Sequence, residues 1–235
     1  MFKIRIANLN VMIDNMFDFI ENYCKDYIID SDSVCDIEVH STQEKIEYER
    51  KVTPETFPDY FYELTSVYRE ICDKALKYDT IFIHASSIAY EDNALLFLAL
   101  SGTGKSTHAR MWKEVYGDKI SYINDDKPLL RKIDGKWMVC GTPWNGKHRR
   151  GENKMLPLKG ICLIKRNETN FTKEISSSEI LSRLFNQIIM PRNKDALNKT
   201  LDLVSDLLEN NKMYEINCNI SHEAAIKAHD AILIL

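Results

Sequence analysis

The chain has 235 residues, of which 44% are hydrophobic, enough to build a real core and typical of a soluble globular protein. Its net charge of −4 gives no global basic field, so nucleic acid is not expected as the main partner. No apolar run approaches about 18 residues, so we expect no membrane span. The six cysteines are dispersed and form no CxxC pair, which predicts free thiols in a reducing cytoplasm.

Residues 1–78 are predicted to form a small N-terminal α+β region. Charged and apolar residues alternate at the start of the chain, as in a strand, and Pro54 and Pro58 mark a later break. Apolar residues then recur at helical spacing. The expected elements are a strand at 3–6, a helix at 12–27, strands at 34–40 and 45–51, and a helix at 60–78.

Residues 79–235 are predicted to form a mixed α/β core that ends in helices. Its first two strands are almost wholly apolar, which suits strands covered on both faces. Asp134 and Gly135 predict a hairpin turn. The expected elements are strands at 80–85 and 94–100, a helix at 106–116, a strand at 119–123, a hairpin at 128–139, a polar loop at 141–151, a strand at 158–165, helices at 178–190 and 194–210, a strand at 214–218 and a helix at 221–235.

A glycine-containing loop joins the second core strand to the helix after it. It departs from the phosphate-binding pattern G-x-x-x-x-G-K-[ST] by one residue, because Ala99 stands where the first glycine is expected. Glycine permits the backbone angles that turn N–H groups toward an anion, and a helix N-terminus adds a positive dipole end. The loop therefore predicts a nucleotide site rather than a bland turn, with these residues: Ser101, Gly102, Thr103, Gly104, Lys105, Ser106 and Thr107.

Two side chains in this loop have an expected role. Lys105 is predicted to place its charge on the terminal phosphates, and Ser106 to offer its hydroxyl to Mg²⁺. The expected cofactors are accordingly ATP and Mg²⁺.

Asn124, Asp125 and Asp126 follow the next strand along the chain. Two adjacent carboxylates there suit two tasks, one as a ligand of Mg²⁺ and one as acceptor of a proton from an attacking hydroxyl. The alternative is a simple Asx turn, since this tripeptide forms turns by itself. Its position after a strand and downstream of the glycine loop favours the functional interpretation.

Two further groups are candidates. The loop 141–151 carries Lys147, Arg149 and Arg150, which would hold an anionic substrate or balance charge on a transferred phosphoryl group. A solvated basic turn is the alternative for each of them. His84 ends the strand that precedes the apolar strand before the glycine loop, and a lone histidine is more often structural than catalytic.

Four segments in this order resemble the P-loop superfamily of HPr kinase/phosphorylase and ATP-dependent phosphoenolpyruvate carboxykinase. They are His84-Ala85-Ser86, the stretch from Leu100 to His108, the stretch from Asn124 to Pro128, and Gly141-Thr142-Pro143-Trp144. The resemblance covers about Ile81 to Ile164. It implies a core with a mixed, partly antiparallel sheet.

The resemblance also implies roles for individual residues. His84 would lie at the active site, and Asp125 and Asp126 would be metal ligand and catalytic acid/base, in an order it leaves open. Arg149 and Arg150 would contact substrate, and a homo-oligomer would be in keeping with the family. The chain lacks the oxaloacetate-binding half of a carboxykinase, so carboxykinase activity is not expected. The phosphorylase signature of HPr kinase is not evident, so the resemblance leaves phosphorolysis and HPr as a substrate open.

Two functions remain open on the sequence. The leading hypothesis is a kinase that transfers the γ-phosphate of ATP to a hydroxyl, either a serine of a protein or peptide or a small-molecule alcohol. The alternative is an ATP-binding sensor or accessory protein that performs no phosphotransfer. The acceptor itself is not identified by any residue pattern.

Overall fold

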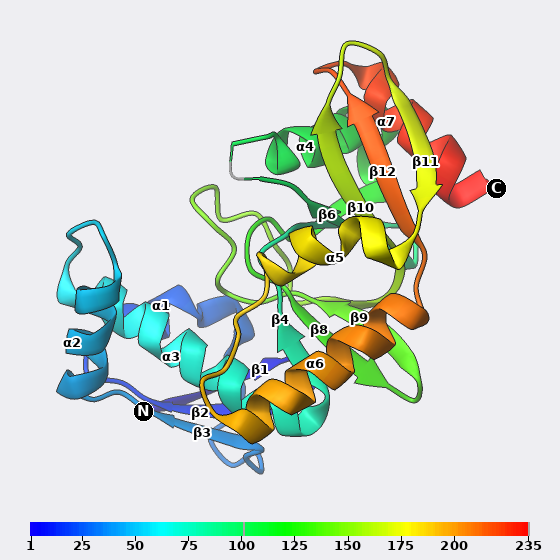
Figure 1. The fold of residues 1–235 in the computed structure, drawn as a ribbon. Helices are drawn as coiled ribbons and strands as arrows, with labels where there is room; N and C mark the ends of the chain where they lie inside the picture. Colours follow the sequence, from blue (N-terminus) through cyan, green and yellow to red (C-terminus); the bar gives the residue numbers. More distant parts are fainter. Residues whose placement is uncertain (101, 235) are drawn as a thin grey trace.

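A computed structural model describes residues 1–100 and 102–234. The chain forms a mixed α/β fold with two β-sheets, a small one built from the N-terminal residues and a larger one that holds the rest (Figure 1). The strands are β1 (Phe2–Ile6), β2 (Leu9–Asp14), β3 (Ile37–His40), β4 (Thr80–Phe82), β5 (Ser86–Tyr90), β6 (Asn93–Leu98), β7 (Ile120–Asn124), β8 (Leu129–Ile133), β9 (Lys136–Cys140), β10 (Met155–Arg166), β11 (Phe171–Ile175) and β12 (Met213–Cys218).

The helices lie on both faces of the large sheet and beside the small one. In the described residues no helix is long and apolar enough to cross a membrane. The helices are α1 (Phe19–Tyr23), α2 (Gln43–Val52), α3 (Asp59–Ala75), α4 (Lys105–Tyr116), α5 (Ser177–Phe185), α6 (Lys194–Glu209) and α7 (His222–His229), with 3₁₀ turns at Lys25–Tyr27, Leu76–Tyr78 and Gly117–Lys119 and a π-helical turn at Asp230–Ile234.

The small sheet has the strand order β1-β2-β3, antiparallel and then parallel. Ala7 and Asn8 both take positive φ, 51° and 56°, as a two-residue turn of a twisted hairpin requires. Leu9, Val11 and Ile13 then alternate into the core. The predicted helix at 12–27 is therefore wrong in its first part, because the apolar residues there follow the period of two of a strand; α1 and the 3₁₀ turn at Lys25–Tyr27 are helical.

The predicted strand at 45–51 is also wrong, since this segment is helix α2. Its start is fixed by Thr42, whose hydroxyl accepts a hydrogen bond from the backbone N–H of Lys45 at 3.4 Å. Such N-cap bonds satisfy donors that a helix otherwise leaves free. Ile46 and Glu49 are buried at helical spacing, and Glu49 receives two hydrogen bonds from Arg69 of α3. The neighbouring helix thus selects the helical state.

The large sheet is mixed and has the order β4-β8-β9-β10-β6-β5-β7, with β12 beside β10 and β11 beside β12. Strand β10 is its centre. The start of β10 pairs antiparallel with β9, while its later part pairs parallel with both β6 and β12. The expected mixed α/β class is confirmed. The hairpin at Asp134 and Gly135 is also confirmed, with φ of 49° and 79°.

Helices cover the large sheet on both faces, which explains its unbroken apolar strands. Helices α5 and α6 pack on one face, and α4 and α7 on the other (Figure 1). Helix α3 packs against both β3 and β4, so it joins the small sheet to the edge of the large one. Trp144 lies in that shared core, stacked on Tyr68 at 4.3 Å between ring centroids.

Most of the predicted core elements are confirmed with shifted ends, but the strands β5 and β11 were not predicted. The predicted strand at 80–85 ends earlier, at Phe82, and β5 begins at Ser86. The residues between them cross to the next part of the sheet, where the N–H of Ala85 bonds the carbonyl of Asp126 at 3.0 Å. Strand β11 was missed because its exposed, mainly polar side chains carry no strong apolar pattern.

Candidate active site

Polar side chains gather at one edge of the large sheet because of its topology. Strands β6 and β7 flank β5 and both pair antiparallel with it, so the carboxyl ends of β6 and β7 meet the start of β5. Strand β10 runs parallel to β6 and ends at the same edge with Arg166. Ligand sites of open α/β sheets lie outside the carboxyl ends of the strands. This edge is accordingly the candidate active site.

The glycine-containing loop lies at this edge, between β6 and α4. Gly102 and Gly104 have φ of 73° and 123°, where side chains with a Cβ atom are strained. Gly104 is the N-cap of α4, and its carbonyl accepts the N–H of His108 at 2.8 Å. Lys105 is therefore the first residue of the helix, where the dipole favours an anion. The predicted site residue Ser101 lies outside the described residues.

Asn124 organises the turn after β7. Its side-chain oxygen accepts the backbone N–H groups of Asp126 at 2.9 Å and Lys127 at 2.6 Å, so an Asx turn is present. Its amide nitrogen donates to the carbonyl and the hydroxyl oxygen of Thr142 at 3.1 and 3.0 Å. Asn124 is completely buried. Asn124 therefore both forms the Asx turn and fixes the segment that carries the two carboxylates against the loop 141–151.

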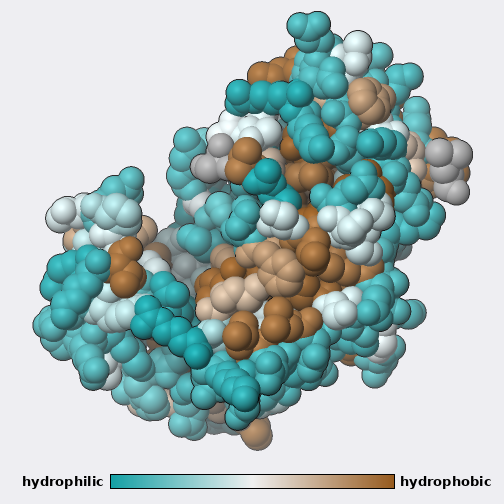
Figure 2. All heavy atoms as spheres, viewed as in Figure 1, coloured by the Kyte–Doolittle hydropathy of each residue, from teal (hydrophilic) through white to brown (hydrophobic). Residues whose placement is uncertain are grey.

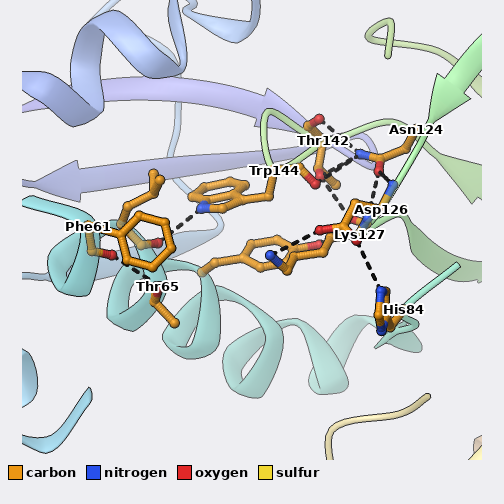
Figure 3. Close-up of polar contacts among 10 residues, drawn as sticks. Phe61, Thr65, His84, Asn124, Asp126, Lys127, Thr142 and Trp144 are labelled. Atoms are coloured by element: carbon orange, nitrogen blue, oxygen red, sulfur yellow. Dashed lines mark hydrogen bonds and ion pairs between the residues drawn. The ribbon is translucent and has the colours of Figure 1, made fainter. Parts of the chain in front are cut away.

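The two adjacent carboxylates have different partners. Asp125 is buried, and its Oδ1 accepts the hydroxyl of Ser86 at 2.8 Å. Asp126 is engaged at both oxygens: Nε2 of His84 lies 3.0 Å from Oδ1, and Nζ of Lys127 lies 3.1 Å from Oδ2 (Figure 3). The sequence left the division of labour between these carboxylates open. Their surroundings now separate them.

Electrostatics follow from these contacts. Burial raises the pKa of Asp126, but the hydrogen bond from His84 and the charges of Lys127 and His84 lower it by more, so the pKa is lowered overall. The pKa of Lys105 is also lowered, because burial disfavours the ammonium more than the charges of Asp126 and Asp125 favour it. The site thus contains an ionised carboxylate, Asp126. It also contains a partly desolvated cation, Lys105, whose burial the two nearby carboxylates do not fully offset.

A cleft of about 530 Å³ brings most of the predicted residues together. Glycine loop, helix start and carboxylates all face it, although Gly102 and Asp126 lie 24 positions apart in the sequence. The predicted residues that line it are His84, Gly102, Gly104, Lys105, Ser106, Thr107, Asp125, Asp126 and Lys147. Thr103 lines a neighbouring pocket, also of about 530 Å³, which shares Gly102, Gly104 and Thr107 with this cleft.

The basic residues of loop 141–151 are placed differently from one another. Lys147 lines the cleft, whereas the guanidinium of Arg149 lies 3.8 Å from the ring of Tyr23 and donates to its carbonyl oxygen at 3.0 Å. Arg150 lies over the ring of Tyr122, at 5.4 Å. Of the three, Lys147 is the one that faces the cleft of the carboxylates.

Several residues of the site were given no role from the sequence. Ser86 and Lys127 contact the two carboxylates, and His148 lines the cleft. Arg166 donates to the carbonyl oxygens of Gly102 and Thr103 and so braces the glycine loop. Ser86 and Lys127 belong to segments that carry the family resemblance, which was an available signal. Arg166 gave none, because only the pairing of β10 with β6 brings it to the loop.

Comparison with known proteins adds little to this geometry. No protein-family model matches the chain, and no curated protein matches it. Among solved structures it is similar to the HPr(Ser) kinase/phosphatase from Coxiella burnetii, at 8% identity and a TM-score of 0.38, over 63% of this chain and 94% of that chain. The two folds are only remotely alike at those values.

Proposed function

We propose that this protein is an ATP- and Mg²⁺-dependent phosphotransferase that moves the γ-phosphoryl group of ATP to a hydroxyl acceptor. One observation carries the proposal. A carboxylate held between two cationic or hydrogen-bonding groups, Asp126, faces the same cleft as the glycine-capped start of α4 with Lys105. In this proposal the start of α4 would bind phosphate and Asp126 would accept a proton in the same cleft.

The phosphate side of the cleft suits a nucleoside triphosphate. Gly102 and Gly104 provide the open backbone, and the first turn of α4 provides free N–H groups and a positive dipole end. Lys105 supplies a charge whose burial lowers its pKa. Bound phosphate would add negative charge there and favour the ammonium. The adjoining pocket with Thr103 and Arg166 would take the nucleoside.

The residues fit Mg²⁺ of the kind that binds through a nucleotide. Over the described residues, no three His, Cys, Asp or Glu side chains gather as metal ligands. Mg²⁺ at phosphotransfer sites instead uses one or two carboxylates, a hydroxyl, water and phosphate oxygens. Ser106 and Asp125 would hold it, because the ammonium of Lys127, 3.1 Å from Asp126, disfavours a divalent cation at that carboxylate. When bound, Mg²⁺ would neutralise charge on the β- and γ-phosphates.

Asp126 would act as the proton acceptor. The acceptor oxygen forms a bond to the γ-phosphorus, the bond between that phosphorus and the β–γ bridging oxygen breaks, and ADP leaves. The hydroxyl proton passes to the Asp126 carboxylate, which His84 and Lys127 keep ionised. A weakly basic carboxylate is sufficient because the nucleophile loses its proton late in a loose transition state. Lys147 would balance charge on the transferred group.

Nucleotide binding and transfer are tested separately. Lys105→Ala should weaken the binding of Mg²⁺·ATP at least tenfold in titration calorimetry, whereas Lys119→Ala, an exposed lysine paired with Glu91, should not. Asp126→Asn should keep nucleotide binding and lose both slow ATP hydrolysis and labelled transfer from γ-labelled ATP. Asp125→Asn should lose transfer and also the dependence of ATP affinity on Mg²⁺.

The alternative function, an ATP-binding sensor, makes a different prediction. A sensor would bind nucleotide through Lys105 but show neither hydrolysis nor transfer in the wild-type protein, with any acceptor supplied. If Lys105→Ala left nucleotide affinity unchanged and no hydrolysis occurred, both functions would be excluded.

A further inference from the structure

A second hollow opens beside the carboxylate that would accept the proton. It measures about 590 Å³ and shares Asp126, Gly146 and Lys147 with the phosphate cleft. Figure 2 shows the surface hollowed between the side that carries α2 and α3 and the body of the molecule. We call this hollow the acceptor pocket. Its position places whatever enters it next to the site of transfer.

Six of the fifteen residues that line it are aromatic. Tyr68 stacks on Trp144 at 4.3 Å, and Tyr23 lies 6.4 Å from Trp144. Phe61 and Phe19 complete the wall toward the solvent, where Phe19 is 40% exposed. Figure 3 shows Phe61 and Trp144 on one side of the pocket and Asp126 with Lys127 at its inner end. Rings therefore lead from the surface to the carboxylate.

Polar side chains line the pocket beside the rings, and they are unevenly placed; Thr65 and Arg69 belong to α3. Asp126, Lys127 and Lys147 lie at the end that borders the phosphate cleft. Arg149 is held against Tyr23 at the other side. Pockets that select small ligands or side chains have this composition, an apolar wall with a small number of converging polar groups, at volumes of about 300 to 1,000 Å³. A polyhydroxylated acceptor would leave its hydroxyls against rings without partners.

We propose that the acceptor carries a large apolar group, preferably aromatic, within a few bonds of the hydroxyl that is phosphorylated. The hydroxyl would reach Asp126 while the apolar group lies among Tyr23, Phe61 and Trp144. This inference rests on the proposed phosphotransfer and adds the specificity of the same site. It also gives the N-terminal region a task, because α1 and α3 supply seven of the fifteen residues that line the pocket.

Two matched pairs of probes test the inference and show whether the phosphorylated hydroxyl belongs to a free alcohol or to a peptide. For a free alcohol the pair is 2-phenylethanol and ethanol; for a peptide it is N-acetyl-Phe-Ser-amide and N-acetyl-Gly-Ser-amide. Transfer from γ-labelled ATP is measured as kcat/KM, and binding of each probe in the presence of Mg²⁺ and a non-hydrolysable ATP analogue is measured by saturation-transfer NMR. Burial of one ring predicts at least about a tenfold advantage for the aromatic member of at least one pair.

Variants locate that preference. Phe61→Ala should bring the ratio between the two members of the favoured pair toward one, because it removes a ring from the wall. Phe171→Ala is the matched control: Phe171 is 43% exposed on β11 and is not among the residues that line the pocket. It should leave the ratio unchanged.

The outcomes distinguish the two levels of the proposal. If Mg²⁺·ATP binds but neither pair shows an aromatic advantage in transfer or in binding, the acceptor assignment is overturned while nucleotide binding stands. An advantage that survives Phe61→Ala also overturns it. Absence of Mg²⁺·ATP binding overturns the proposed function and this inference together. Transfer to the peptide pair alone, or to the alcohol pair alone, supports the inference and names the source.

Discussion

At the scale of single residues, the contacts of a carboxylate decide which chemical role it can take. Asp125 and Asp126 are neighbours in sequence, yet one accepts a hydrogen bond from a buried serine hydroxyl and the other lies between His84 and Lys127. The hydrogen bond from His84 and the charge of Lys127 lower the pKa of Asp126. This difference allows distinct tasks, and it leads to predictions about pH.

Removal of His84 should shift the acid limb of the rate profile. In His84→Ala, Asp126 loses the hydrogen bond that lowers its pKa, so the pKa rises. The ionised base is lost as pH falls through that pKa, and the loss should therefore begin at a higher pH than in the wild type. The measurement is kcat/KM for transfer, or for ATP hydrolysis, against pH. His40→Ala, which removes an exposed histidine 3.4 Å from Asp14, should leave the profile in place; an unmoved limb in His84→Ala would contradict the pairing.

His108 predicts a pH dependence of stability that is unrelated to catalysis. It is buried, and burial lowers its pKa from 6.5 to about 4; Trp112 donates to its Nε2 at 3.1 Å, which fixes the neutral ring. Between those values the unfolded chain binds the proton and the folded chain does not, so stability falls as pH drops from 6.5 toward 4. The loss is about 3 kcal/mol.

The same experiment has an internal comparison. Urea unfolding at pH 7 and pH 4.5 should show a smaller difference for His108→Gln than for the wild type, since an amide oxygen still accepts from Trp112 but does not titrate. His222→Gln removes an exposed histidine paired with Glu114 and should keep the wild-type difference. Equal differences in all three proteins would contradict a neutral buried His108.

At the scale of elements, the site depends on how strands and helices end. The glycine loop ends β6 and caps α4, and the Asx turn of Asn124 ends β7. Both turns place backbone groups where regular structure stops. The first turn requires a positive φ at Gly104 and the second requires the side-chain hydrogen bonds of Asn124, so each can be perturbed by one substitution.

Gly104→Ala should weaken Mg²⁺·ATP binding at least tenfold. At φ of 123° an added Cβ is strained, and relaxation would turn the first N–H groups of α4 away from the phosphates. Gly117→Ala offers a matched control at the other end of the same helix, with φ of 55° and open space around the added atom. It should cost about 1 to 2 kcal/mol of stability but leave ATP affinity intact. Equal ATP affinities in both variants would argue against a phosphate site.

Asn124→Ala should destabilise the fold by about 3 kcal/mol, because it leaves buried partners of several hydrogen bonds unsatisfied. It should also reduce transfer by releasing Asp126 from loop 141–151. Asn153→Ala removes one exposed hydrogen bond to the carbonyl of Arg5 and should stay within about 0.5 kcal/mol of the wild type. Chemical denaturation measures the stability of both variants. If Asn124→Ala were as stable as Asn153→Ala, the side chain of Asn124 would not be needed to stabilise the turn.

At the scale of the whole molecule, the N-terminal residues and the core share one apolar cluster. Trp144 donates to the carbonyl of Leu64 at 3.0 Å, and Leu129 and Cys140 lie in the same cluster as the small sheet. Arg131 of β8 donates to the carbonyl of Ala7. The loop that packs against Asp126 is therefore held from the N-terminal side.

A protein containing only residues 79–235 should consequently be unstable. The faces of Leu129, Cys140 and Trp144 would be exposed, so we expect a lower melting temperature, or none, and strong binding of a hydrophobic dye compared with the full chain. Circular dichroism and dye fluorescence measure this. Unchanged melting of the shorter chain would show instead that the boundary predicted near residue 78 separates independent domains.

The sequence by itself determined the elements whose pattern is long or chemically specific. Helix α3, the apolar strand β6, the turn at Asp134 and Gly135 and the Lys105–Ser106 helix start follow from local rules, because apolar spacing and glycine act over a few residues. It misassigned α2 and β2, since short segments with mixed patterns take the state that their neighbours select.

Only the tertiary structure decided how the site is assembled. Strand order brings His84, Lys105 and Asp126 to one cleft, gives each aspartate its own partners, and turns Arg149 toward Tyr23 rather than toward the carboxylates. It also carries Phe61 and Tyr68 beside Asp126. Contacts between segments distant in the chain arise from packing and strand pairing, which no local pattern records.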